Sequence, residues 1–217
     1  MAKTDVWPVI HDERKALAAQ LEGISEAAWG TRSLCSDWTV RDVLAHMTAT
    51  TELSGASFFP KLIGSGFSLK KLQAKDIARE RGSSGPEALE RFTARLDSTG
   101  RPPGPVDTML GEVLVHSEDI RRPLGLTQAH QPEAVMQAAD FYKRSNLILG
   151  TKARIAGVTL RATDGDWSHG DGPLVEGAMM SLLLAMTGRT AALDDLRGAG
   201  VAVLRSRAEH AHRQGER

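Results

Sequence analysis

Three side chains that can bind metals or move protons recur at helical spacing just past the middle of the chain. Glu112 and His116 are four residues apart, and Asp119 follows three residues later. Residues three and four apart lie on one face of a helix, so a carboxylate, an imidazole and a second carboxylate would share one seam. Burying such groups without partners is costly, so they either satisfy one another or hold a ligand. The apolar side chains that would turn this face toward the interior are Met109, Val113 and Ile120.

A metal site is the first chemistry that this pattern predicts. The spacing of Glu112 and His116 lets one helix present two ligands to one cation. His46 is the candidate third ligand, because it lies at the edge of an apolar stripe that begins at Val40. Two histidines and one glutamate form a catalytic zinc set that leaves a fourth position open, although iron or nickel would also accept these ligands. The other interpretation is an ordinary core histidine bonded to Glu112, with Asp119 and Arg122 as a helical ion pair.

The helix that would carry His46 has a clear beginning. Thr39 and Asp42 have the spacing of a capping box, and Trp38 and Val43 suit a hydrophobic staple. Other segments with helical spacing, separated by turn residues and prolines, are 5–21, 68–81, 86–96, 106–122 and 132–149.

The pattern changes after Gly150. It predicts a strand or hairpin over 155–163, an apolar helix over 173–187 and a final strand over 201–204. We therefore expect a mainly α protein. It would comprise a metal-binding helical bundle at 1–150, a small α+β C-terminal domain at 151–205 and a polar tail at 206–217.

Composition excludes several function classes. The 27 Lys and Arg residues balance 27 Asp and Glu residues, which argues against nucleic-acid binding. The longest apolar run, 179–186, is far shorter than the roughly 20 residues that cross a bilayer, so no membrane association is expected. The single cysteine allows no intrachain disulfide, and the N-terminus has no apolar signal core. A cytoplasmic location is therefore expected, with small molecules as partners.

Three segments resemble a known family. The helix-opening motif of the mycothiol-dependent maleylpyruvate isomerase family is similar to Cys35-Ser36-Asp37-Trp38-Thr39-Val40-Arg41-Asp42-Val43-Leu44-Ala45-His46-Met47. Residues 112–119 resemble its second motif, Glu-x-x-x-His-x-x-Asp, and 173–189 resemble the helix of its smaller C-terminal domain. The family belongs to the DinB-like superfamily of metal-binding four-helix bundles. The resemblance thus implies a DinB-like four-helix bundle followed by a small α+β domain.

The resemblance also implies roles for individual residues. The ligands of Zn²⁺ or another divalent metal would be His46, Glu112 and His116. Asp119 would either hydrogen-bond to one of the metal ligands or face the substrate. Arg122 and Arg189 are candidates for substrate binding, although an arginine at a helix end can also act simply on the helix dipole.

The family's chemistry requires mycothiol as a low-molecular-weight thiol cosubstrate. An open metal position can keep a thiol as thiolate near neutral pH. Its addition to an electrophilic double bond, followed by rotation and elimination, would give cis–trans isomerisation of the maleylpyruvate type. Without elimination the product is an S-conjugate, so the enzyme could be an isomerase or an S-transferase. Cys35 is not needed as the nucleophile, because no base lies near it in the sequence.

Two other functions fit the same residues. The bundle could be a non-catalytic binding or regulatory protein that has lost its metal or keeps it for structure. It could also be a metal-dependent hydrolase, in which Asp119 or Glu118 serves as general base toward a metal-activated water.

Overall fold

The chain divides into two structural units, Met1–Ala129 and His130–Arg217. The computed structural model describes the backbone of residues 5–35, 37–146 and 149–215 and the side chains up to residue 210. The division lies near residue 130 and not near residue 150, where we expected it. The reason is that helix α8 (Pro132–Tyr142) packs against α10 (Met179–Met186) of the second unit.

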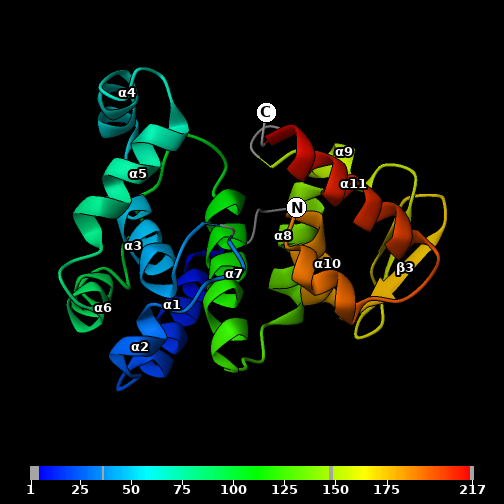
Figure 1. Ribbon diagram of the computed structural model, residues 1–217, viewed down its shortest axis with the longest axis horizontal. Helices are drawn as coiled ribbons and strands as arrows, with labels where there is room; N and C mark the ends of the chain where they lie inside the picture. The colour runs from blue at the N-terminus through cyan, green and yellow to red at the C-terminus, as the bar shows by residue number, and fades with distance from the viewer. Residues whose placement is uncertain (1–4, 36, 147–148, 216–217) are drawn as a thin grey trace. The chain divides into compact units, whose positions relative to one another are not determined.

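The first unit is a helical bundle. Helix α3 packs against α5, α6 and α7, and α1 packs against α6 and α7 (Figure 1). This arrangement, with the small sheet of the second unit, confirms the predicted mainly helical fold class. The elements in chain order are α1 (Trp7–Leu21), α2 (Glu26–Trp29), α3 (Val40–Thr50), α4 (Gly55–Ile63), α5 (Leu69–Glu80), α6 (Gly85–Thr93), α7 (Asp107–Arg121) and the 3-10 turn η1 (Arg122–Leu124).

Helix α3 begins as its sequence predicts. The backbone N–H of Asp42 donates to the Thr39 hydroxyl at 3.2 Å, and the backbone N–H of Thr39 donates to the Asp42 carboxylate at 3.0 Å. This reciprocal capping box fixes the first turn. The apolar stripe then turns toward the bundle core, where Val40, Val43 and Met47 are buried.

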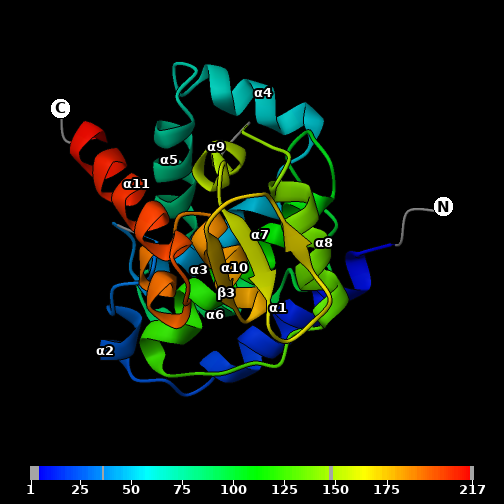
Figure 2. The same ribbon diagram turned by 90° about the vertical axis from the view of Figure 1, so that its right-hand side faces the viewer.

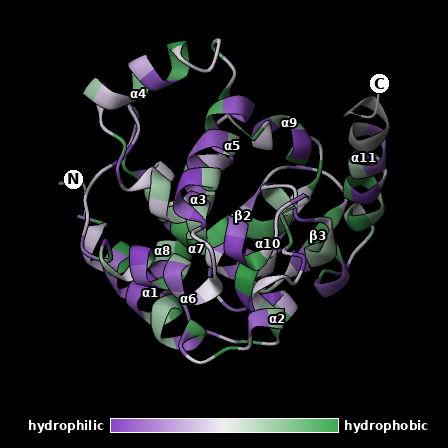
Figure 3. Cartoon of the chain, turned by 60° about the vertical axis from the view of Figure 1, so that its left-hand side comes forward, coloured by the Kyte–Doolittle hydropathy of each residue, from purple (hydrophilic) through white to green (hydrophobic). Residues whose placement is uncertain are grey.

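Two short helices of the first unit, α2 and α4, were not predicted from the sequence. Helix α2 has only four residues, and α4 has a partly buried face but no fully buried residue. Helix α4 lies at the edge of the bundle (Figure 3). The large apolar side chains exposed in α4, in the turn after it and at the start of α5 are Phe59, Ile63, Phe67 and Leu69. Within the described residues, no helix combines the length and apolar character needed to cross a bilayer.

The second unit is a small α+β fold. Its sheet has the order β2-β1-β3, with β1 antiparallel to β2 and parallel to β3. Helix α10 packs on β1 and β3 (Figure 2). The elements are α8, α9 (Thr151–Ile155), β1 (Thr159–Ala162), β2 (Ser168–His169), β3 (Leu174–Gly177), α10, η2 (Thr190–Asp195) and α11 (Gly200–Gly215).

Several predicted elements of this unit are wrong. The segment 173–187 is not one helix, because its first part pairs with β1 as strand β3 and α10 begins only at Met179. The segment 201–204 is not a strand but the start of α11, which packs against η2 and β3. The described part of the expected polar tail continues that helix to residue 215. The helix expected over 132–149 ends at Tyr142, and residues 147 and 148 lie outside the description.

Candidate metal centre

The two predicted histidine ligands meet where α3 packs against α7. The ring centroids of His46 and His116 are 5.0 Å apart, and the rings meet edge to face at 79°. Trp38 lies against both rings, with centroid distances of 4.9 Å to His46 and 6.2 Å to His116. Side chains 70 positions apart in the sequence are thus neighbours. The capping box fixes where α3 begins. It therefore places Trp38 just before the N-cap residue and His46 in the second turn of the helix.

Asp119 fixes the orientation and the tautomer of His116. The Nδ1 atom of His116 is 2.8 Å from Oδ2 of Asp119, which is fully buried. An ionised carboxylate can only accept a hydrogen bond, so Nδ1 carries the proton and donates it. The lone pair of the neutral ring is then on Nε2. Histidines that bind metals are held in this way by a carboxylate on their other nitrogen.

The ion pair that we considered between Asp119 and Arg122 is not the one that forms. Arg122 donates from Nε to Glu118 at 3.0 Å, one helical turn before it. Asp119 instead accepts a hydrogen bond from His116. The alternative of an ordinary helix ion pair therefore describes Glu118 and Arg122, not Asp119.

Glu112 is a carboxyl group that titrates near neutral pH. Burial raises its pKa to about 7, against the opposing effects of a hydrogen bond from Thr50 and of the positive charge of Arg14. These two neighbours come from α3 and α1, so Glu112 is directed toward the helices that pack on α7. Burial destabilises the ionised form of this carboxyl group, and a nearby cation would stabilise it.

Cys35 is a neighbour of the site that the sequence did not reveal. Among the described residues, one group of three potential metal-binding side chains has its ligand atoms within 4.8 Å of one another, and it consists of Cys35, His116 and Asp119. His116 belongs both to this group and to the predicted set. The base that we did not find near Cys35 in the sequence comes from α7. Ser36, the next residue of the motif, lies outside the described part. The predicted set of His46, Glu112 and His116 stays a prediction.

A buried arginine positions α7 on α1. Arg121 is completely buried and donates from Nε to Gln20 at 2.7 Å and from Nη1 to Glu13 at 3.3 Å. Glu118 lies 3.9 Å from the same Nη1. Burial lowers the pKa of Arg121, while the charges of Glu13 and Glu118 oppose this effect. The network lies at the end of α7 that also carries His116 and Asp119, so it fixes the helix that presents them.

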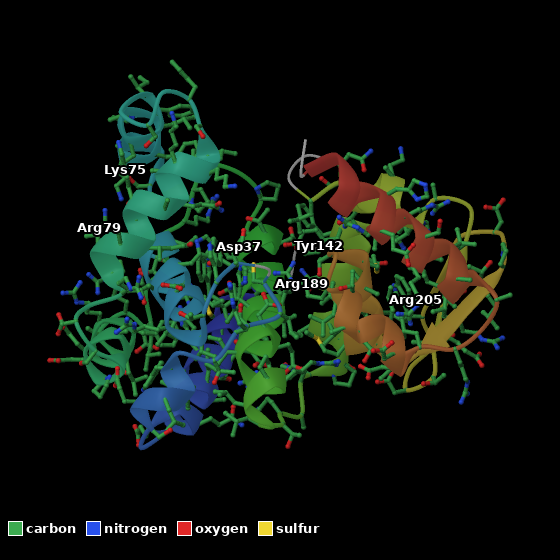
Figure 4. The ribbon with its side chains drawn as sticks, in the orientation of Figure 1. Asp37, Lys75, Arg79, Tyr142, Arg189 and Arg205 are labelled. Atoms are coloured by element: carbon green, nitrogen blue, oxygen red, sulfur yellow. The ribbon has the colours of Figure 1, made fainter. Side chains whose placement is uncertain are left out.

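The two candidate substrate arginines have different surroundings. Arg122 lies in the first unit and is half-buried in its ion pair with Glu118. Arg189 lies in the second unit, between α10 and η2 (Figure 4), and donates from Nη1 to the carbonyl of Thr187 at 3.0 Å. It is buried, and its charge adds to the effect of burial in lowering the pKa of Arg154. The role of Arg122 and of Arg189 in substrate binding stays a prediction.

Comparison with known proteins identifies the family. Two crystal structures are similar, both of the mycothiol-dependent maleylpyruvate isomerase, and each comparison covers 89% of this chain and 91% of the other. A histidine-to-alanine mutant is 16% identical with a TM-score of 0.58, and the structure without that mutation is 15% identical with a TM-score of 0.54. At these identities the likeness shows the fold. No curated protein matches the chain. Residues 10–121, just over half of the chain, match the mycothiol maleylpyruvate isomerase N-terminal domain, and the chain belongs to that family.

Proposed function

We propose that this chain is a zinc-dependent enzyme that activates mycothiol for addition to an electrophilic substrate and catalyses a maleylpyruvate-type cis–trans isomerisation. The observation that carries the proposal is the meeting of His46 with His116, whose ring is held by Asp119. Membership of the family and the likeness to the two isomerase structures supply the thiol and the substrate class.

The residues present fit a divalent cation. Two imidazoles and a carboxyl group with a raised pKa come from two packed helices, and this nitrogen-rich set suits zinc. The bond from His116 Nδ1 to Asp119 leaves Nε2 as the donor. A cation bound there would hold the sulfur of the thiol as a thiolate at neutral pH and so supply the nucleophile.

The chain's own side chains orient the reaction. Asp119 keeps the His116 ring in one tautomer, and Trp38 lies against both imidazole rings. The thiolate adds to the double bond of the substrate, which becomes a single bond that can rotate. Elimination restores the double bond in the trans form and releases the thiol, so the thiol is not consumed. If elimination does not follow, the product is an S-conjugate.

Substrate recognition is assigned to arginine. A maleylpyruvate-type substrate carries carboxylates, and Arg122 and Arg189 are the proposed partners for them. Arg122 would have to exchange Glu118 for the substrate. Arg189 is buried in the second unit and donates to the Thr187 carbonyl.

The hydrolase alternative is less favoured by the arrangement of carboxylates. Asp119 is engaged by His116, and Glu118 is engaged by Arg122. Both groups that could have served as the general base for a water are therefore already accepting hydrogen bonds. No contact among the described residues favours a purely regulatory role.

The experiment is an isomerase assay with each component removed in turn. The zinc-loaded chain is mixed with mycothiol and maleylpyruvate, and cis and trans isomers are followed by NMR. We expect conversion only with both metal and thiol, and none with His116→Ala. The matched control is His210→Ala, which removes an exposed histidine on α11. Mass spectrometry distinguishes an accumulating S-conjugate from an isomer. Conversion without thiol, or unchanged conversion by His116→Ala, would overturn the proposal.

A further inference from the structure

The position of Cys35 beside the site is built by the backbone of its loop. The N–H of Leu34 donates to the carbonyl of Asp119 at 3.2 Å, which ties the loop directly to α7. The N–H of Cys35 donates to the Ser33 hydroxyl at 3.1 Å, and the carbonyl of Cys35 accepts from the N–H of Trp38 at 3.0 Å. Both backbone polar groups of Cys35 are thus engaged. The loop thus fixes the backbone of Cys35 beside α7, and in the described conformation its sulfur lies within 4.8 Å of a ring nitrogen of His116.

The distances suit a shared cation. In a tetrahedral zinc site with bonds of about 2.3 Å to sulfur and about 2.0 Å to nitrogen, the two ligand atoms lie about 3.5 Å apart. The sulfur of Cys35 and a ring nitrogen of His116 are already within 4.8 Å without an ion. The remaining difference is about 1 Å, and Cys35 is a free cysteine with a partly exposed side chain.

Asp119 has a different part in this group. Its Oδ2 is 2.8 Å from His116 Nδ1, which is a hydrogen-bond distance. It is shorter than the roughly 3.3 Å between an oxygen and a nitrogen that bind the same zinc ion. Asp119 therefore supports His116, and Cys35 is the member of the group that can add a donor.

We infer that Cys35 is an additional protein donor to the cation held by His116, and that it occupies the position which the thiol cosubstrate takes during turnover. The role rests on the proposed function, since it presupposes that cation. When the thiol enters, Cys35 leaves the ion and accepts the proton that the entering thiol loses. One sulfur replaces another, and no oxidant or reductant is needed. A soft sulfur donor also favours zinc over magnesium or manganese.

Cobalt spectroscopy tests this role directly, because the chain has only one cysteine. The full chain is treated with chelator, reduced with a thiol-free phosphine and given one equivalent of Co²⁺. A sulfur-to-cobalt charge-transfer band in the near ultraviolet can then come only from Cys35. We expect this band in the native chain and its loss in Cys35→Ser and Cys35→Ala, both of which should still bind cobalt. Adding mycothiol to Cys35→Ser should create the band.

The outcomes separate this role from the proposed function. If the native chain binds cobalt but its spectrum without thiol equals that of Cys35→Ser, the role of Cys35 is refuted and the metal site stands. If the native chain binds no cobalt, both are refuted. Cobalt absorption in the visible region and circular dichroism show that each variant has folded and loaded. His116→Ala is the control that should lose both visible and near-ultraviolet absorption.

Discussion

The titration of Glu112 makes a quantitative prediction for the metal-free protein. Its pKa is raised by burial from 4.5 to about 7. Between these values the folded chain keeps a proton that the unfolded chain releases, so the free energy of unfolding falls as the pH rises through this window. A difference of about 2.5 between the two pKa values corresponds to about 3 kcal/mol. This is an upper bound, because the residue as a whole keeps some exposed surface.

Glu112→Gln removes this dependence, because an amide does not ionise. The metal-free variant and the metal-free native chain are unfolded with urea at pH 5, 6, 7 and 8. We expect the variant to gain stability relative to the native chain by about 2–3 kcal/mol from pH 5 to pH 8. Other titrating groups cancel in this difference. Glu90→Gln, which changes an exposed glutamate, should show a constant difference. A constant difference for Glu112→Gln as well would refute the assignment of Glu112 as a buried carboxyl.

Three further predictions concern neighbouring features. Asp119→Asn should weaken zinc binding roughly 10–100-fold without abolishing it, measured by competition with a chelating dye; unchanged affinity would show that Asp119 does not support His116. Thr39→Ala should lower the free energy of unfolding by about 1 kcal/mol because the α3 capping box is lost, and an unchanged urea midpoint would contradict it. Arg121→Ala should cost roughly 3–5 kcal/mol, since Glu13 then loses its buried partner; a loss below 1 kcal/mol in calorimetric melting would contradict the network.

The helical part of the site could be predicted from the sequence because it depends on local rules. The spacing of Glu112, His116 and Asp119 places them on one seam of α7 whatever the rest of the fold does. The Thr39 capping box likewise specifies where α3 begins. The packing of α3 against α7 is a tertiary contact between segments distant in sequence. The apolar stripes on both helices and the family resemblance suggested it.

The position of Cys35 could not be predicted, because it depends on contacts distant in sequence. The hydrogen bond from Leu34 to the carbonyl of Asp119 joins residues 85 positions apart, and no local pattern encodes it. The choice of Asp119 for His116 and of Glu118 for Arg122 was equally open, since both pairings have helical spacing. Only the packed structure decides between them.

The second unit shows the same limit for secondary structure. Residues 174–177 read as the start of an apolar helix, but they become β3 by pairing in parallel with β1, fifteen residues earlier. Val201 and Val203 favour a strand by propensity, yet they lie in the first turns of α11, whose Leu204 is buried. Pairing and packing over long sequence distances override local preference in both places.

Calorimetric titration of mycothiol into the chain, with and without its metal, tests the central claim most directly. The zinc-loaded protein should bind about one thiol per chain, the chelator-treated protein should give no binding heat, and added zinc should restore it. Equal binding of mycothiol by the loaded and the chelator-treated protein would contradict the claim that His46, Glu112 and His116 hold a cation for an incoming sulfur.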